Sequence, residues 1–189
     1  MKMRAQKNAR KYLVVIVTAL ILIAVNFTIY QREQTLAHGK IVLLELAPVD
    51  PRSLMQGDYM ALNYQIANQA FSMNNLNADT EHNKKFPQDG HIIVGLNDKA
   101  VAQFKRFDTD EFKLESNEIK LRYRMRNGLP KFATNAFFFE EGSAAFYEKA
   151  RYGEFRVAEN GELILTKMRD KDLLELGKNQ SEVESEFDK

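Results

Sequence analysis

The chain has 189 residues, of which 27 are Lys or Arg and 26 are Asp or Glu, for a formal net charge of +1. Five of the cations lie within the first eleven residues, so the remainder carries −4 and gives no sign of nucleic-acid binding. Cysteine is absent, which excludes disulfides, thiol catalysis, thiolate metal sites and haem attachment through C-x-x-C-H.

Residues 12–31, YLVVIVTALILIAVNFTIYQ, contain no charged side chain. At a rise of about 1.5 Å per residue, a helix of this length crosses the roughly 30 Å hydrocarbon core of a bilayer. Tyr12 and Tyr30 bracket the run, and amphipathic rings prefer the membrane interface. The sequence therefore predicts a transmembrane anchor over residues 12–31, with the lipid bilayer as its partner.

The basic tail over residues 1–11 sets the expected orientation. Because Lys and Arg are retained on the cytoplasmic side, the tail is predicted to be cytoplasmic and the residues after 31 to be outside. A cleaved signal peptide is the alternative interpretation. Its apolar region usually has about 7–15 residues and ends at small residues. The run here is longer, and Thr35-Leu36-Ala37 is a poor cleavage match.

After a polar connector over residues 32–39, the pattern predicts one extracytoplasmic domain over 40–176 and a disordered acidic tail over 177–189. Apolar alternation and turn residues indicate the strands. We expect them at 40–47, 58–66, 90–97, 100–107, 118–125, 131–139, 154–157 and 162–168.

Helices are expected to be few in the domain. A single helical turn is expected at 52–55, and a short helix is expected at 68–73 within a loop at 67–88. A further helix, capped by Ser143, is expected at 144–151. The predicted fold class is mainly β (α+β): a single N-terminal transmembrane helix, then a mostly antiparallel domain of about eight strands with one short helix.

Four cations alternate along one predicted strand: Lys120, Arg122, Arg124 and Arg126. Period two places all four on one face. They are either a solvated face or a contact for an anionic surface, meaning phospholipid headgroups or an acidic loop of a partner.

The segment Gly57-Asp58-Tyr59-Met60-Ala61-Leu62-Asn63-Tyr64 fits the motif G-D-Y-x-x-L-x-Y at every position. The chain therefore resembles the bacterial GDYXXLXY protein family, from about residue 12 to 170. The resemblance implies a small, single-span protein of the bacterial inner membrane with a periplasmic domain and no assigned activity. It also implies a multi-pass membrane protein as partner.

The residue types suggest two roles for the motif. In the first, it is structural: Gly57 permits a turn, Asp58 accepts backbone hydrogen bonds or pairs with Arg52, and Leu62 and Tyr64 enter the core. In the second, Tyr59, which faces the other way, forms a binding surface with Arg52.

A membrane-surface hydrolase distantly related to signal-peptidase-like β folds is the enzymatic alternative. Ser53-Leu54 before Gly57-Asp58 echoes a signal-peptidase box, but Val49 stands where the reactive serine would be and has no hydroxyl.

No other catalytic or cofactor pattern is present in the sequence. There is no P-loop and no G-x-G-x-x-G, and His38, His82 and His91 lack metal-ligand spacing. Glu140-Glu141 precedes a predicted helix, where negative charge is favourable in any case. We expect no cofactor, no metal and no catalytic residue, and a non-enzymatic accessory or interaction subunit.

Overall fold

The computed structural model describes residues 2–47, 59–76, 87–109, 113–126 and 129–177. Its contacts divide the chain into two compact units, Met1–His38 and Gly39–Lys189. The predicted turn at 52–55, residues 127–128 between two predicted strands, and the tail from residue 178 lie outside the described residues.

The first unit is one helix, α1, over Lys2–His38. Its stretch Lys11–His38 is long and apolar enough to cross a membrane, and every side chain from Lys11 to Gln34 is exposed. The polar groups of the apolar run bond within the helix. Asn26 Nδ2 donates to the Leu22 carbonyl at 2.8 Å, and Thr28 Oγ1 donates to the Ala24 carbonyl at 2.9 Å.

The predicted connector over 32–39 is not a separate segment, because α1 continues through it to His38. Residues 31–38 are mostly good helix formers and include neither Gly nor Pro. Gly39 is the first residue that disfavours a helix, and β1 (Lys40–Glu45) begins directly after it.

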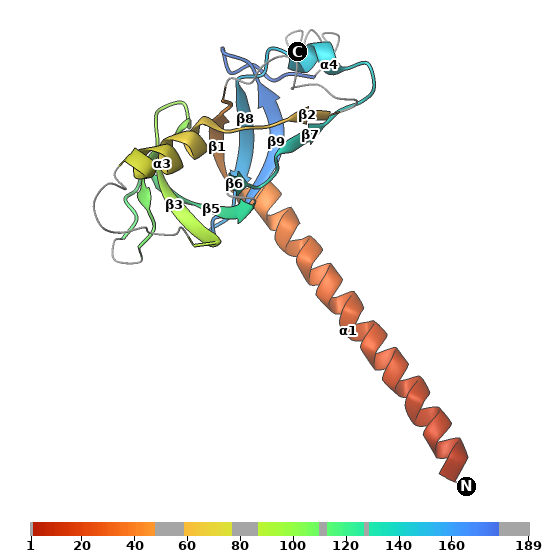
Figure 1. Cartoon of the computed structure of the whole chain (residues 1–189). Helices are drawn as coiled ribbons and strands as arrows, with labels where there is room; N and C mark the ends of the chain where they lie inside the picture. The colour runs from red at the N-terminus through yellow and green to blue at the C-terminus, as the bar shows by residue number, and fades with distance from the viewer. Residues whose placement is uncertain (1, 48–58, 77–86, 110–112, 127–128, 178–189) are drawn as a thin grey trace. The chain divides into compact units, whose positions relative to one another are not determined.

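The second unit contains two antiparallel sheets and a ribbon (Figure 1). One sheet has the order β1-β8-β9, with β8 at Tyr152–Val157 and β9 at Leu163–Arg169. The other has the order β4-β3-β5-β6. Its strands are β3 (Asp89–Leu96), β4 (Ala102–Phe107), β5 (Glu118–Arg126) and β6 (Leu129–Phe132). The ribbon pairs β2 (Tyr59–Ala61) with β7 (Ala136–Phe138).

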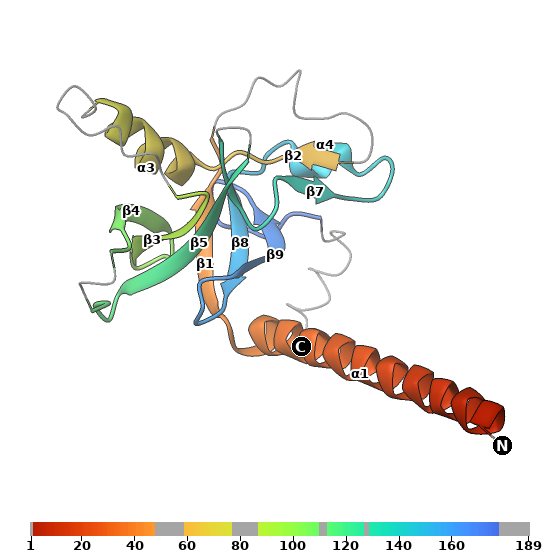
Figure 2. The same cartoon turned by 60° about the horizontal axis from the view of Figure 1, so that its bottom comes forward.

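Two helices accompany the strands, α3 (Gln65–Leu76) and the four-residue α4 (Ala144–Tyr147). In Figures 1 and 2, the β1-β8-β9 sheet lies between α3 on one side and α4 with the β2–β7 ribbon on the other. Phe71 docks α3 on the four-stranded sheet, with ring centroids 5.3 Å from Phe107 and 5.1 Å from Tyr123.

One continuous core joins both sheets, the ribbon and α3. It includes side chains from β1, β2, β3, β5, β6, β8 and β9, among them Val42, Met60, Ile92, Leu121, Phe132, Phe155 and Met168. The fold is therefore mainly β and mostly antiparallel, as the alternating patterns predict.

Several predicted strands are confirmed nearly to the residue. They are the strand at 40–47, the two strands at 90–97 and 100–107, the strand at 118–125, and the hairpin at 154–157 and 162–168. Asn97 closes the link between β3 and β4, since its Oδ1 accepts the Lys99 and Val101 amides at 3.0 and 2.9 Å.

The strand predicted at 58–66 is wrong in length. In its described part, the continuous ladder covers Tyr59–Ala61, Tyr64 forms an isolated bridge with Leu46, and α3 begins at Gln65. That helix is also longer than the one predicted at 68–73. The alternation of buried side chains persists without a ladder, since Met60, Leu62, Tyr64 and Ile66 are all buried. Burial, not continuous pairing, produces the period-two pattern.

The strand predicted at 131–139 is two strands. β6 pairs with β5 and β7 pairs with β2, and Ala133 between them has φ of +27°. The helix predicted at 144–151 ends at Tyr147, and Ser143 makes no capping hydrogen bond. Tyr152 begins β8 and pairs with Arg169.

Candidate functional site

The last part of the G-D-Y-x-x-L-x-Y segment enters the core. Leu62 and Tyr64 are each 2% exposed. The Tyr64 ring lies edge-on to Phe132 and Phe155, with centroids 6.3 and 5.7 Å away. Its hydroxyl donates to the Thr134 carbonyl at 2.7 Å. The predicted need of this buried hydroxyl for a partner is therefore met by the backbone at the bend between β6 and β7.

Burial raises the pKa of the Tyr64 hydroxyl well above its usual value, because the phenolate would lose its hydration. The side chain is thus a neutral hydrogen-bond donor across the physiological pH range.

Backbone hydrogen bonds fix the same segment on both sides. The Leu62 amide donates to the Asn135 carbonyl at 2.7 Å, and Asn135 Nδ2 returns a bond to the Leu62 carbonyl at 3.2 Å. The Ala47 amide donates to the Asn63 carbonyl at 2.8 Å. Residues 62–64 therefore connect the end of β1 to the bend that leads into β7.

Tyr59 has a different environment. It stands opposite Phe138 in the β2–β7 ribbon, with ring centroids 5.7 Å apart. The two residues are 37% and 74% exposed, and they form what we call the ribbon pair. The next pair of residues along the ribbon, Met60 and Phe137, faces the protein. Phe137 packs on Tyr147 of α4 at 5.0 Å, so the ribbon is apolar on both faces.

The first two motif residues, Gly57 and Asp58, lie outside the described residues, as does Arg52. The predicted Asp58–Arg52 contact and the surface shared by Tyr59 and Arg52 stay predictions. The sequence did not reveal Phe138. The signal was the Phe137-Phe138-Phe139 run, but only the β2–β7 pairing shows which of the three rings joins Tyr59.

The four-cation stripe lies on β5 as predicted, and the alternating residues Ile119, Leu121 and Tyr123 are buried. Two of the cations are neutralised within the domain. Lys120 Nζ lies 2.5 Å from Asp108, and Arg122 Nη1 lies 3.1 Å from Glu162. Arg124 lies 3.7 Å from Asp89, and both of these side chains are half exposed. The stripe is therefore not one uniform charged face.

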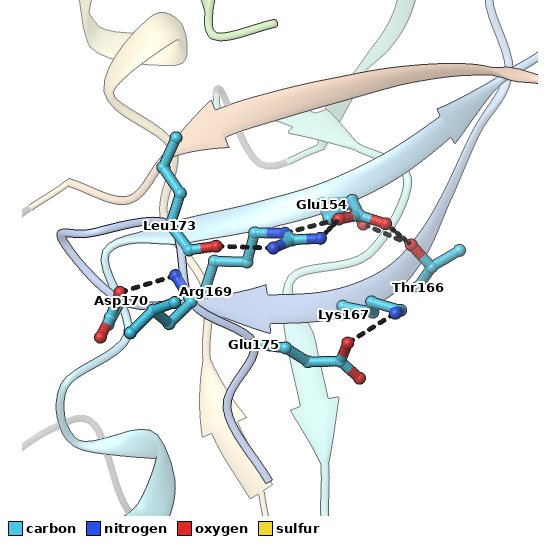
Figure 3. Close-up of polar contacts among 8 residues, drawn as sticks. Glu154, Thr166, Lys167, Arg169, Asp170, Leu173 and Glu175 are labelled. Atoms are coloured by element: carbon cyan, nitrogen blue, oxygen red, sulfur yellow. Dashed lines mark hydrogen bonds and ion pairs between the residues drawn. The ribbon is translucent and has the colours of Figure 1, made fainter. Parts of the chain in front are cut away.

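A buried polar cluster joins β8, β9 and the turn that follows (Figure 3). Glu154 has a side chain only 5% exposed and pairs with Arg169 through Nε at 2.5 Å and through Nη2. Arg169 Nη1 also donates to the Leu173 carbonyl at 2.6 Å. Lys167 pairs with Glu175 at 2.6 Å. The cluster fixes the turn at 170–176 against β9, which is a structural role.

A second buried carboxylate, Glu118 on β5, is held by Arg106 of β4 at 2.5 and 2.8 Å. The Arg106 guanidinium, by hydrogen bonding, lowers the pKa of the Glu118 carboxyl. Glu118 is thus an ionised partner of Arg106 within the sheet rather than an acid available for proton transfer.

The two described histidines, His38 and His91, have different local surroundings. His38 is exposed at the end of α1, and His91 Nε2 lies 3.2 Å from the Asn160 carbonyl. His82, like Val49 and Ser53, lies outside the described residues. Within the described ranges, no three His, Asp or Glu side chains are grouped to hold a metal ion.

A comparison with protein families matches residues 21–168 to the GDYXXLXY protein family. The chain belongs to the GDYXXLXY family. The match starts within the apolar part of α1 and ends in β9, so it spans the second half of the apolar run and nearly all of the β domain. Comparisons with curated proteins and with solved structures gave no significant match.

Within the described part of the GDYXXLXY motif, the side chains lie in two different environments. Leu62 and Tyr64 are buried and bonded at a junction of three strands, whereas Tyr59 faces outward. The family's name-giving motif therefore contains both core residues and a surface residue.

Proposed function

We propose that this GDYXXLXY protein is a non-enzymatic accessory subunit of a multi-pass membrane protein. It would be anchored by α1 in the bacterial inner membrane, with its N-terminus in the cytoplasm and its β domain in the periplasm. Its domain would contact the partner through the ribbon pair, Tyr59 and Phe138.

The exposure of the ribbon pair is the observation that supports a protein partner. Two aromatic rings stand side by side on one face of the ribbon, and one of them is 74% exposed. Aromatic side chains are enriched among the residues that dominate binding energy, because a rigid ring buries much apolar area at little entropic cost. The adjacent part of the same motif is used for packing, so among the described fixed positions of the motif Tyr59 is the one available for recognition.

The apolar helix supports anchoring. A helix that is exposed and apolar on all sides suits a lipid environment, and its polar groups Asn26 and Thr28 are satisfied inside the helix. The cations of residues 1–11 support the cytoplasmic placement of the N-terminus.

The direct test is photo-crosslinking in intact cells. A photoreactive amino acid replaces Tyr59 in the full chain, and crosslinked proteins are identified by mass spectrometry. We expect one multi-pass membrane protein to be captured from position 59. The matched control position is Phe146, which is 54% exposed but belongs to α4 and not to the ribbon pair.

Substitutions then test the contribution of the pair. Tyr59→Ala and Phe138→Ala are expected to weaken co-purification of that protein in mild detergent, by roughly tenfold or more in affinity if the pair is a binding centre. Phe146→Ala should leave it unchanged. Recovery of the same partner at the wild-type level by Tyr59→Ala, with the domain folded, would overturn the proposal.

No observation on the described residues favours the membrane-surface hydrolase, and we do not propose that activity.

A further inference from the structure

At the end of the β5–β6 hairpin, the structure places Lys131 beside two cations that the sequence pattern already predicts on one face, Arg124 and Arg126. Arg124 stands directly opposite Lys131, and Arg126 stands opposite Leu129. The preceding pair, Tyr123 and Phe132, is buried. Because facing residues share one side of an antiparallel pair and sides alternate, Arg124, Arg126, Leu129 and Lys131 share the outer side. We call these four residues the hairpin patch.

The charge of the hairpin patch is only partly compensated. Like charges directly opposite each other disfavour strand pairing, and Arg124 and Lys131 are such a pair. Among the described residues, the carboxylate that pairs with the patch is Asp89, which is 3.7 Å from Arg124 and half exposed. Further along β5, Lys120 and Arg122 are held at 2.5 and 3.1 Å by Asp108 and Glu162. Positive charge on this side of the described strand is therefore concentrated at the hairpin end.

Leu129 gives the hairpin patch its second property. Its apolar side chain is 60% exposed, opposite Arg126 and close to Arg124 and Lys131. An exposed aliphatic side chain among cations matches the boundary between anionic headgroups and acyl chains, where apolar groups enter and cations stay with the phosphates. An acidic protein loop would match the cations but leave Leu129 without an apolar environment.

We propose that the hairpin patch binds anionic phospholipid headgroups. The inference rests on the anchoring part of the proposed function, and it is independent of the multi-pass partner. The domain begins at Gly39, directly after a helix long and apolar enough to cross a bilayer, so an anchored chain keeps the domain near lipid. The chain beyond residue 11 has a net charge of −4, so attraction to an anionic surface requires a local cationic patch of this kind.

The absence of cysteine permits a clean test with the full chain in lipid nanodiscs. Leu129→Cys is labelled with an environment-sensitive fluorophore. In discs that mix phosphatidylcholine with phosphatidylglycerol, we expect blue-shifted emission relative to discs of phosphatidylcholine alone. The shift should shrink as salt is raised, because screening weakens contacts between exposed charges. The control label is placed at Leu174→Cys, since Leu174 is 65% exposed in the turn after β9.

A variant with fewer positive charges provides the second part of the test. The triple substitution Arg124→Gln, Arg126→Gln and Lys131→Gln should reduce the lipid-dependent shift at position 129 at least about threefold. A matched variant, Lys99→Gln, Lys113→Gln and Lys149→Gln, removes the same charge from exposed positions elsewhere and should reduce it little. Thermal unfolding of both variants verifies that the domain remains folded.

Three results would each overturn the proposal. They are equal emission at position 129 in both lipids, an equal lipid response at position 174, and an undiminished shift in the folded hairpin variant. Because the discs contain no multi-pass protein, these results are separate from the crosslinking at Tyr59. Failure of one experiment therefore does not decide the other.

Discussion

Tyr59 and Tyr64 stand five positions apart in one motif but face opposite environments. Tyr64 is 2% exposed and bonded to the Thr134 carbonyl, whereas Tyr59 is 37% exposed beside Phe138. Odd spacing along an extended segment places the two rings on opposite sides. The same residue type thus stabilises the fold at one position and offers a surface at the other.

Tyr64→Phe is expected to destabilise the domain by about 1 kcal/mol or more, because it leaves the part-buried Thr134 carbonyl without its donor while keeping the ring. Denaturant unfolding of the full chain in detergent measures the change. Tyr59→Phe is the matched control and should change the free energy of unfolding by less than about 0.5 kcal/mol, as surface substitutions usually do. Equal effects at the two positions would contradict the structural role of Tyr64.

The same variant should alter the pH dependence of stability. Burial raises the folded-state pKa of Tyr64 above the ordinary value of 10.0, so its contribution is fully present below that pH. Above about pH 10 the unfolded chain loses the proton more readily, and stability falls. The free energy of unfolding of Tyr64→Phe should therefore fall less steeply than that of the wild type between pH 9 and pH 11. At neutral pH the variant should be the less stable of the two.

At the scale of elements, the turn between β8 and β9 joins the two sheets. The Gly161 carbonyl accepts the Arg122 amide of β5 at 2.8 Å, and Glu162 pairs with the Arg122 side chain. Gly161 has φ of +81°, and an added Cβ would lie 3.1 Å from the Lys120 carbonyl oxygen and 3.2 Å from the Arg122 nitrogen. A side chain at this position would be strained and would also push the turn off β5.

Gly142 offers a matched comparison, since its φ is +84° but nothing lies within 4 Å of an added Cβ. Gly142→Ala should cost about 1–2 kcal/mol from the backbone conformation alone. Gly161→Ala should cost about 1 kcal/mol or more beyond that, because the methyl group crowds the β5 backbone. Thermal unfolding of the two variants compares them. Equal losses would show that the turn does not pack on β5 as described.

The reach of sequence patterns is clearest in β5, β6 and β7. Strict alternation predicted β5 and its cationic face, because a strand with one buried side has period two whatever it packs against. The prediction of one strand at 131–139 was wrong because this β-prone segment contains two strands that pair with different partners. No local signal indicates at which residue a chain leaves one sheet for another.

At the scale of the whole molecule, the chain combines one long apolar helix with one β domain. This composition makes the orientation testable with single cysteines. With Lys99→Cys, an impermeant maleimide should label intact spheroplasts, because Lys99 is exposed in the domain. With Gln6→Cys, labelling should require permeabilised membranes, because positive tails stay in the cytoplasm.

The reverse labelling pattern would contradict the proposed orientation. Loss of the first thirty residues from the mature chain would instead support the cleaved signal peptide. Size measurement by mass spectrometry on the purified chain separates these two outcomes.

The sequence by itself determined the apolar helix, the family, the mainly β class and the alternating face of β5, because these depend on composition, on one local motif and on local periodicity. Only the tertiary structure decided that Tyr64 bonds at the β6–β7 bend, that Phe138 joins Tyr59, and that Lys131 and Leu129 complete the cationic end of the β5–β6 hairpin. These facts depend on which strands pair and in what register, and pairing is set by contacts between residues far apart in the chain.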